Sequence, residues 1–146
     1  MRRSAIVVVL LVAVAVGARV RASHNPFRAQ ETRPGGGWTI PPAAKTETSP
    51  LQVTDKVLAS GRSMFKSKCV RCHGPAGKGD GPDADPEHAE DMDLTNSDRA
   101  AINPDGVVFY KIWNGRQQPK MPAFKSEMTK DEVWTIVSYV QTLRAK

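Results

Sequence analysis

The stretch Cys69-Val70-Arg71-Cys72-His73 decides how the rest of the sequence is interpreted. It holds two thiols separated by two residues, and a histidine follows the second thiol directly. This is the five-residue pattern of c-type haem attachment. In that chemistry the thiols add to the two vinyl groups of the porphyrin, and the histidine projects at the iron. The motif therefore predicts one covalent haem c, bound through Cys69 and Cys72, with His73 as the proximal iron ligand.

A Cys-x-x-Cys pair can also form a redox disulfide or part of a zinc site. The thioredoxin-type setting requires a βαβ pattern, which the sequence lacks. A structural zinc site needs four ligands. The motif supplies three of them, and only His24, His88 or a carboxylate could be the fourth. Both alternatives stay open at this point, behind haem.

A methionine is expected as the second axial ligand. A six-coordinate iron needs a donor opposite His73, and a thioether there favours ferrous iron and raises the potential. Met121 is the preferred candidate because it lies in an irregular loop before the last expected helix, where Pro122 restricts the backbone. The other candidates have simpler roles: Met64 as core, Met128 as packing beside a helix cap, and Met92 in an acidic loop.

The N-terminus has the composition of an export signal. Arg2 and Arg3 precede the apolar run Ala5–Ala18, which is shorter than the roughly 20 residues of a spanning helix. A charged start followed by such a run is typical of a secretory signal. Residues 1–22 are therefore predicted to be a signal peptide, and an uncleaved membrane anchor is the alternative. The expected location is periplasmic or otherwise exported.

Residues 23–52 are rich in proline and glycine and poor in aliphatic side chains. Such a stretch buries too little apolar surface to offset its chain entropy. It is predicted to be an extended tail, although Trp38 and Ile40 could pin it to the following domain. The haem domain is then expected over 53–146.

Two helices are expected on either side of the long loop 74–102. The first begins with Thr54 or Asp55 as its cap and runs to about Lys68. It contains Gly61, which costs about 1 kcal/mol relative to alanine unless another helix crosses closely there. The second has Asn103 as its cap and Pro104 at its first position, and it ends near Gly115.

A third helix follows the loop 115–128. Thr129 and Glu132 have the spacing of a capping box. Apolar residues then recur at helical intervals, at Val133, Trp134, Ile136, Val137, Val140 and Leu143. No alternating strand pattern of useful length is present. The predicted fold class is mostly α, with about three main helices and long loops around one covalent haem.

Together these motifs resemble the class I c-type cytochromes, over residues 55–146. The text that carries the resemblance is, in order, Gly61-x-x-x-Phe65, Cys69-x-x-Cys72-His73-Gly74, Gly77-x-Gly79-Asp80-Gly81-Pro82, Asp93-Leu94-Thr95, Ile112-x-Asn114-Gly115, Met121-Pro122-x-Phe124 and Glu132-x-Trp134-x-Ile136-Val137-x-Tyr139-Val140-x-x-Leu143. The resemblance implies a cytochrome c-like fold whose first and last helices cross near perpendicular. It also implies that a proline carbonyl accepts the other ring proton of His73, and Pro82 is the best positional match.

Charge is distributed unevenly along the chain. Of 21 Lys and Arg residues four flank the first apolar run, which leaves 17 against 15 acidic residues and argues against a nucleic-acid partner. Asp80–Asp93 holds seven carboxylates and no cation, whereas Arg62–Lys78 and Lys111–Ser126 together hold nine cations and no carboxylate. A basic face around the haem edge, docking an acidic redox partner, is therefore predicted. A calcium site in the acidic run lacks the EF-hand pattern.

The sequence thus predicts an electron carrier and not an enzyme, either free or as the cytochrome subunit of an oxidoreductase complex. A membrane partner is expected only if the N-terminal run stays uncleaved. The alternative function is a haem-based sensor or catalyst of small ligands, in which the sixth position is labile. Met121 discriminates between the two, because a bound thioether closes the site.

Overall fold

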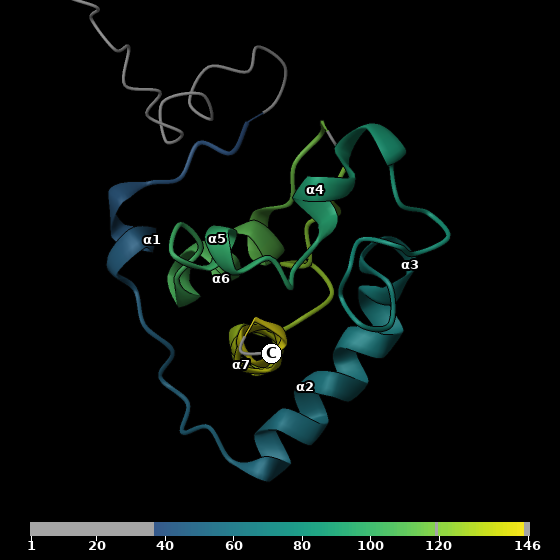
Figure 1. Ribbon diagram of the computed structural model, residues 1–146. Coiled ribbons are helices and arrows are strands. Elements are labelled where there is room, and N and C mark those ends of the chain that lie inside the picture. The colour runs from purple at the N-terminus through teal and green to yellow at the C-terminus, as the bar shows by residue number, and fades with distance from the viewer. Residues whose placement is uncertain (1–36, 119, 145–146) are drawn as a thin grey trace, which may run out of the picture. The chain divides into compact units, whose positions relative to one another are not determined.

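The computed structural model describes residues 37–118 and 120–144, and these residues are helical and loop-rich (Figure 1). Within them no strand forms, and pairing is limited to two isolated bridges, Lys78 with Asp93 and Arg116 with Met121. The mostly α fold class is confirmed. The elements in chain order are α1 (Pro42–Thr46), α2 (Asp55–Lys68), α3 (Val70–His73), the 3-10 turn η1 (Pro86–His88), α4 (Ala89–Met92), α5 (Ser97–Ala100), α6 (Asp105–Asn114) and α7 (Lys130–Leu143).

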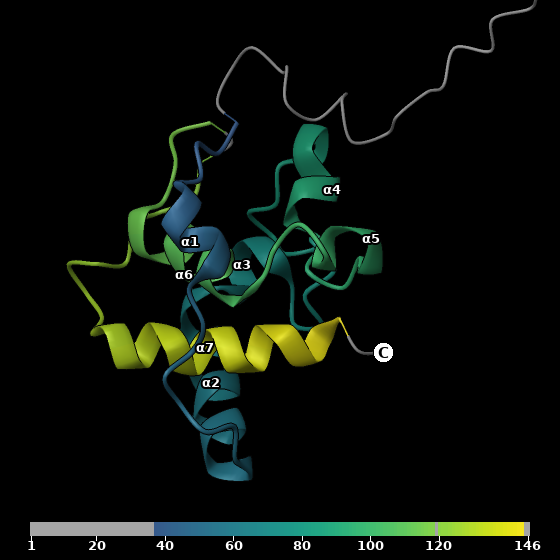
Figure 2. The same ribbon diagram turned by 90° about the vertical axis from the view of Figure 1, so that its left-hand side faces the viewer.

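Helices α2 and α7 cross steeply and in close contact (Figures 1 and 2). Gly61 of α2 lies against the backbone oxygen of Thr135, and a Cβ at this position would be 2.8 Å from the Cβ of Tyr139. Only a residue without a side chain allows this approach. The crossing thus explains the glycine in the middle of α2, as the sequence predicted.

The caps of α2 and α7 are those expected from the sequence. The Thr54 hydroxyl accepts a hydrogen bond from the Val57 amide. At α7, Thr129 and Glu132 form both halves of a capping box. Each cap satisfies backbone donors that the first turn of a helix leaves without an intrahelical partner, so both helices begin where local sequence dictates.

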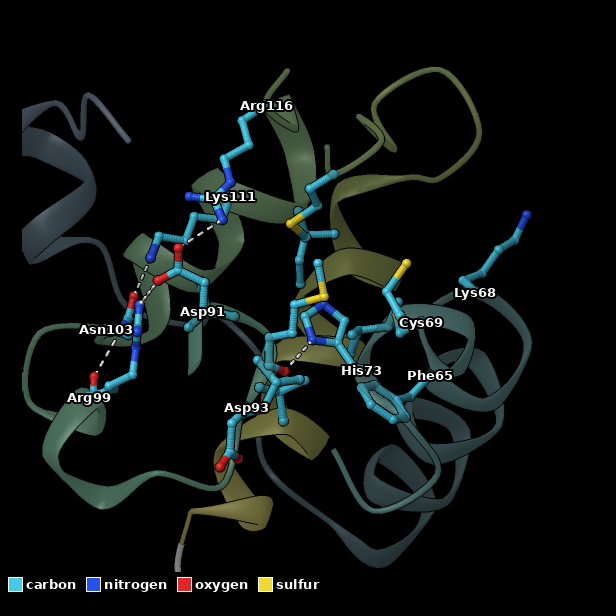
Figure 3. A pocket seen from close by; sticks show the side chains of 18 of the residues that line it. Phe65, Lys68, Cys69, His73, Asp91, Asp93, Arg99, Asn103, Lys111 and Arg116 are labelled. Carbon is cyan, nitrogen blue, oxygen red and sulfur yellow. Dashed lines mark hydrogen bonds and ion pairs between the residues drawn. The ribbon is translucent and has the colours of Figure 1, made fainter. Parts of the chain in front are cut away.

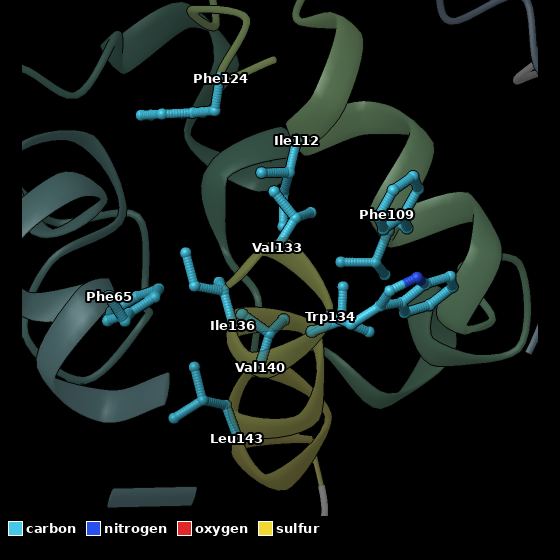
Figure 4. Packing of buried hydrophobic residues seen from close by; sticks show 11 residues of the cluster. Phe65, Phe109, Ile112, Phe124, Val133, Trp134, Ile136, Val140 and Leu143 are labelled. Atoms are coloured by element: carbon cyan, nitrogen blue, oxygen red, sulfur yellow. The ribbon is translucent and has the colours of Figure 1, made fainter. Parts of the chain in front are cut away.

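The apolar side of α7 forms the centre of the core. Its side chains pack with Phe65 of α2, with Phe109 and Ile112 of α6, and with Phe124 of the loop before α7 (Figure 4). The rings of Phe109 and Trp134 stack with centroids 4.3 Å apart. All six positions that the helical spacing identified are buried, namely Val133, Trp134, Ile136, Val137, Val140 and Leu143.

Helix α6 begins one residue later than predicted. Pro104 is the N-cap, with ψ of 170° outside the helical range, and it has no side-chain cap bond. Asn103 does not cap the helix because its side chain is used elsewhere. Its amide donates to the Arg99 carbonyl at 2.8 Å, and its oxygen accepts from Lys111 Nζ at 2.5 Å.

The loop predicted over 74–102 contains the short elements η1, α4 and α5. Two backbone hydrogen bonds hold this segment beside His73. The Gly79 amide donates to the His73 carbonyl at 2.9 Å, and the Leu94 amide donates to the Gly77 carbonyl at 2.7 Å. The segment around Met92 to Leu94 is thereby held against the turn that follows His73.

The described part of the N-terminal segment packs on α6. Ala44 of α1 is buried, and the Gly106 amide of α6 donates to the Glu47 carbonyl at 3.1 Å. This differs from the extended tail predicted over 23–52, because backbone contacts with Gly106 hold a stretch whose own apolar content is low. The predicted signal peptide, residues 1–22, lies outside the described residues. In the described ranges no helix is long and apolar enough to cross a membrane.

Replacing Gly61 by alanine tests the crossing. The added Cβ would collide with the Thr135 backbone and with Tyr139, so we expect the free energy of unfolding to fall by about 1–3 kcal/mol. An unobstructed helical site would instead gain about 1 kcal/mol from the same change. Urea unfolding of the haem-loaded protein measures the difference. Gly37→Ala is the matched control, because nothing lies within 4 Å of its added Cβ, and a G61A protein as stable as this control would contradict the close crossing.

Candidate functional site

A single pocket collects most of the residues that the sequence singled out. It encloses about 1120 Å³ of empty space, which includes the open solvent at its mouth. Cys69, Cys72, His73 and Met121 all line it. Most of the remaining wall is apolar and comes from the core and its edge: Phe65, Leu94, Val108, Ile112, Phe124, Ile136 and Val140.

The attachment motif forms a tight helical turn at the end of α2. Cys69 ends α2, and its carbonyl accepts hydrogen bonds from the amides of Cys72 at 3.2 Å and His73 at 2.9 Å. The short helix α3 then ends at Gly74. This turn brings both sulfurs and the imidazole to one wall of the pocket, where Figure 3 shows Cys69 and His73 side by side.

The His73 ring is fixed by a hydrogen bond from Nδ1 to the Met92 carbonyl oxygen at 2.7 Å. A carbonyl oxygen can only accept, so Nδ1 carries the proton and the lone pair of the neutral ring lies on Nε2. Burial lowers the pKa of His73, and this outweighs the opposite effect of the Met92 carbonyl. The ring is therefore a neutral imidazole with one nitrogen prepared for a metal, and the carbonyl increases its basicity as a ligand.

Met92, and not Pro82, supplies the carbonyl that was predicted for this bond. Pro82 is exposed and is not among the described residues that line the pocket. Met92 reaches the ring because the Leu94–Gly77 hydrogen bond folds the chain back toward His73. Pro82 instead follows Gly81, whose amide is bonded to the Cys72 carbonyl at 3.3 Å on the other side of the motif.

The two thiols are free, and both cysteines are half-buried. Burial, helped by the nearby Cys72, raises the pKa of the Cys69 thiol to about 12. Thiol–disulfide enzymes show the opposite, a lowered pKa that provides thiolate, so the redox-disulfide alternative loses support. No cluster of three or more His, Cys, Asp or Glu side chains able to hold a metal ion occurs in the part of the chain that is described.

Two methionines, Met92 and Met121, line the pocket. Met121 is held by a pair of backbone hydrogen bonds with Arg116, both 2.9 Å long, and Phe124 is tied to the Ile112 carbonyl at 3.1 Å. The Met121 loop is thus anchored to the end of α6 on both sides. Met92 is bound to the His73 ring through its carbonyl, and its sulfur accepts the Asp85 amide at 3.4 Å. The two methionines thus differ: the backbone of Met92 is bonded to the His73 ring, whereas Met121 lies on a separate loop that is bonded to Arg116.

The side of the pocket away from the motif is a cationic wall, formed by Asp91, Arg99, Asn103, Lys111 and Arg116 (Figure 3), together with Arg144, which is bonded to Asn103. Asp91 pairs with Arg99 at 2.7 Å and with Arg116 at 3.5 Å. Arg144 donates to the Asn103 carbonyl at 2.7 Å. Burial, together with the neighbouring Arg99 and Arg116, lowers the pKa of Lys111 to about 8. Cations therefore gather here in excess of their carboxylate partner.

Sequence reasoning missed three contributors to the site. The Met92 carbonyl is a backbone group with no signature of its own. Asn103 was interpreted as a cap, although it joins the cationic wall. Trp38 also lines the pocket; the sequence analysis named it as a residue that could pin the tail to the domain, but not as part of the site.

Comparisons with known proteins agree with this geometry. The cytochrome c family model matches residues 58–144, so the chain belongs to the cytochrome c family. A search among curated proteins gave no match. Among solved structures, a chain of the reducing HAO-like protein complex of Kuenenia stuttgartiensis is similar, with a TM-score of 0.52 and 28% sequence identity. The alignment covers 64% of this chain and 46% of that chain, so this chain spans less than half the length of its neighbour.

Membership of the family implies a covalently bound haem c with its iron. The pocket fits such a group. A porphyrin is a flat, largely apolar ring, and the walls from α2, α6 and α7 are apolar over most of their extent. The donor set has the required chemistry too, with two thiols and a neutral imidazole on one wall.

Asp91→Asn tests the ion pairs of the cationic wall. Burial raises the pKa of Asp91, but the bonds to Arg99 and Arg116 outweigh it and the net pKa is lowered. A lowered pKa means that the contribution to stability is present above the unfolded value of about 4 and is lost as the pH falls through the folded pKa. We expect a loss of about 1–3 kcal/mol at pH 7, shrinking below about pH 4.

Urea unfolding at several pH values measures this effect. Asp83→Asn is the control, because Asp83 pairs with Arg71 at 2.6 Å but on the surface, with side chains 43% and 78% exposed. Such pairs contribute at most about 1 kcal/mol. If both variants lost the same free energy of unfolding, the lower exposure of Asp91 would not strengthen its ion pairs.

Proposed function

We propose that the protein is an exported, periplasmic single-electron carrier whose haem is attached through Cys69 and Cys72 and ligated by His73 and Met121. One observation carries the proposal: Met121 lines the same largely apolar pocket as Cys69, Cys72 and His73, which lie about 50 residues before it in the sequence. The sequence supports export through its first 22 residues, and family membership supports the electron-transfer role.

When bound, the haem supplies the ferric–ferrous couple that exchanges one electron. The residues of the chain set the ligands of the iron and its exposure to water. The Met92 carbonyl keeps the proton on Nδ1 of His73, so Nε2 keeps its lone pair available to bind the iron. Met121, on its anchored loop, supplies a soft ligand that favours the ferrous state. Phe65, Ile136 and Val140 exclude water from the site, which reduces the change in solvation when the charge at the iron changes.

The similar chain from Kuenenia stuttgartiensis is part of a protein complex. We therefore propose that this cytochrome delivers electrons to, or accepts them from, a protein partner, as a free carrier or as a subunit of an oxidoreductase complex. Its partner would dock at the pocket rim. Lys68 and Lys120 are exposed there, whereas Lys111 and Arg116, which sequence reasoning assigned to the docking face, turn toward Trp38 and the cationic wall.

Met121→Ala tests the sixth ligand. The wild-type ferric protein should show the far-red absorption band of methionine–ferric haem and, when reduced, no CO-induced Soret shift. Without the thioether the band should vanish, and CO should bind at least about 100-fold more tightly, or about 2.8 kcal/mol. Met92→Leu and Met128→Ala are controls that should keep the band. Rapid CO binding by the wild type would instead indicate a labile sixth position and a ligand-sensing function.

Ionic strength tests the docking face. Opposite charges steer encounter at low salt, and salt screens them. We expect the bimolecular rate of electron transfer to the physiological partner to fall as salt rises, and Lys120→Gln to slow it about two- to fivefold at low salt. Lys56→Gln is the control, because Lys56 lies thirteen residues before Cys69 on α2, about 20 Å along the helix. A rate independent of salt in the wild type would rule out steering by this face.

A further inference from the structure

Residues 37–50 lie before the part of the chain that matches the cytochrome c family, yet they pack on its helix α6. Gly106 makes this possible. A Cβ there would meet the Ala44 carbonyl oxygen and lie 2.6 Å from the Glu47 carbonyl oxygen. The buried Ala44 and the Gly106–Glu47 hydrogen bond complete the contact. Helix α1 is thus seated on α6 by backbone-to-backbone approach.

This seating brings Trp38 to the polar end of the haem pocket. Its ring centre is 5.5 Å from Lys111 Nζ and 5.0 Å from the guanidinium carbon of Arg116. Both distances are within the range of cation–π attraction. Trp38 is half-buried and lines the pocket, so an aromatic side chain from outside the matched domain forms part of the site.

Cations outnumber carboxylates along the pocket as a whole. Among the described residues that line the pocket, six are Lys or Arg and two are Asp: Lys68, Arg99, Lys111, Arg116, Lys120 and Arg144 against Asp91 and Asp93. Asp93 already accepts hydrogen bonds from the amide and hydroxyl of Thr95. The half-buried cations Lys111 and Arg144 bond to oxygens of Asn103, which carries no charge, so an anion beside them would offset their desolvation further. A haem offers two carboxylates at one edge of its ring.

We propose that residues 37–50 are an integral part of the haem site: seated on Gly106, they hold Trp38 as a cover over Lys111 and Arg116, where the haem carboxylates bind shielded from water. This inference rests on the proposed function, since it requires the haem to occupy the pocket. It assigns Trp38 as a positioning residue that sets the surroundings of the cofactor without touching the iron.

The consequence is a higher reduction potential. The oxidised iron site carries one more positive charge than the reduced site. Low polarity and nearby cations disfavour that charge, and burial and solvent access are established determinants of haem potentials. Water admitted by removal of the cover would screen Lys111 and Arg116 and stabilise the oxidised state.

The test compares midpoint potentials of full-length, haem-loaded variants. Trp38→Ala should raise the ratio of oxidised to reduced protein about tenfold at a fixed ambient potential, which is about 59 mV for one electron. Trp38→Phe should keep most of the wild-type potential, because it retains a ring. Acetylation of Lys111, followed by mass spectrometry, should be several-fold faster in Trp38→Ala than in Trp38→Phe or the wild type.

Gly106→Ala provides an independent arm. It displaces α1 without altering a pocket side chain, and it should lower the potential in the same direction as Trp38→Ala. Val53→Ala is the control, since Val53 is 61% exposed. Potentials and Lys111 reactivities that match this control in both W38A and G106A would overturn the inference while leaving the carrier function intact. Absence of covalent haem or of the far-red band in the wild type would overturn the proposed function itself.

Discussion

The close crossing of α2 and α7 at Gly61 is the constraint on which the rest of the structure depends. Because α2 lies directly on α7, its last residues place Cys69 and the following turn beside Ile136 and Val140. The same contact buries Phe65 and sets the depth of the pocket. A wider separation would move the attachment motif away from the apolar wall that the porphyrin requires. The glycine that makes α2 intrinsically less stable is therefore what brings the binding wall together.

Around this crossing the pocket divides into two chemical regions. One wall has thiols, an imidazole and apolar side chains, all suited to the ring and its iron. The opposite wall gathers guanidinium and ammonium groups around Asp91 and Asn103. A cofactor with an apolar ring and a polar edge can therefore bind in one orientation only, with its polar edge toward the cationic wall. Loop segments from both sides, held by backbone hydrogen bonds to α6 and to the turn after His73, then fix Met121 and the Met92 carbonyl.

Local sequence was sufficient wherever one short segment contains all the information. The capping residues Thr54, Thr129 and Glu132 lie within a turn of the helices they start, and the apolar spacing of α7 identified the buried positions. The attachment motif likewise needs only five consecutive residues. The prediction for Asn103 was wrong because a residue that suits a cap can also bond to distant groups, and here Lys111 and Arg99 use its side chain.

The sequence by itself determined the fold class and the three longest helices, because each depends on neighbours within a few positions. Only the tertiary structure decided which carbonyl faces His73, since a backbone oxygen carries no sequence signature and Met92 reaches the ring through a fold of the intervening loop. The tertiary structure also decided the place of Trp38. Its contact with Lys111 and Arg116 arises from the seating of α1 on Gly106, a fit between distant segments that neither segment specifies alone.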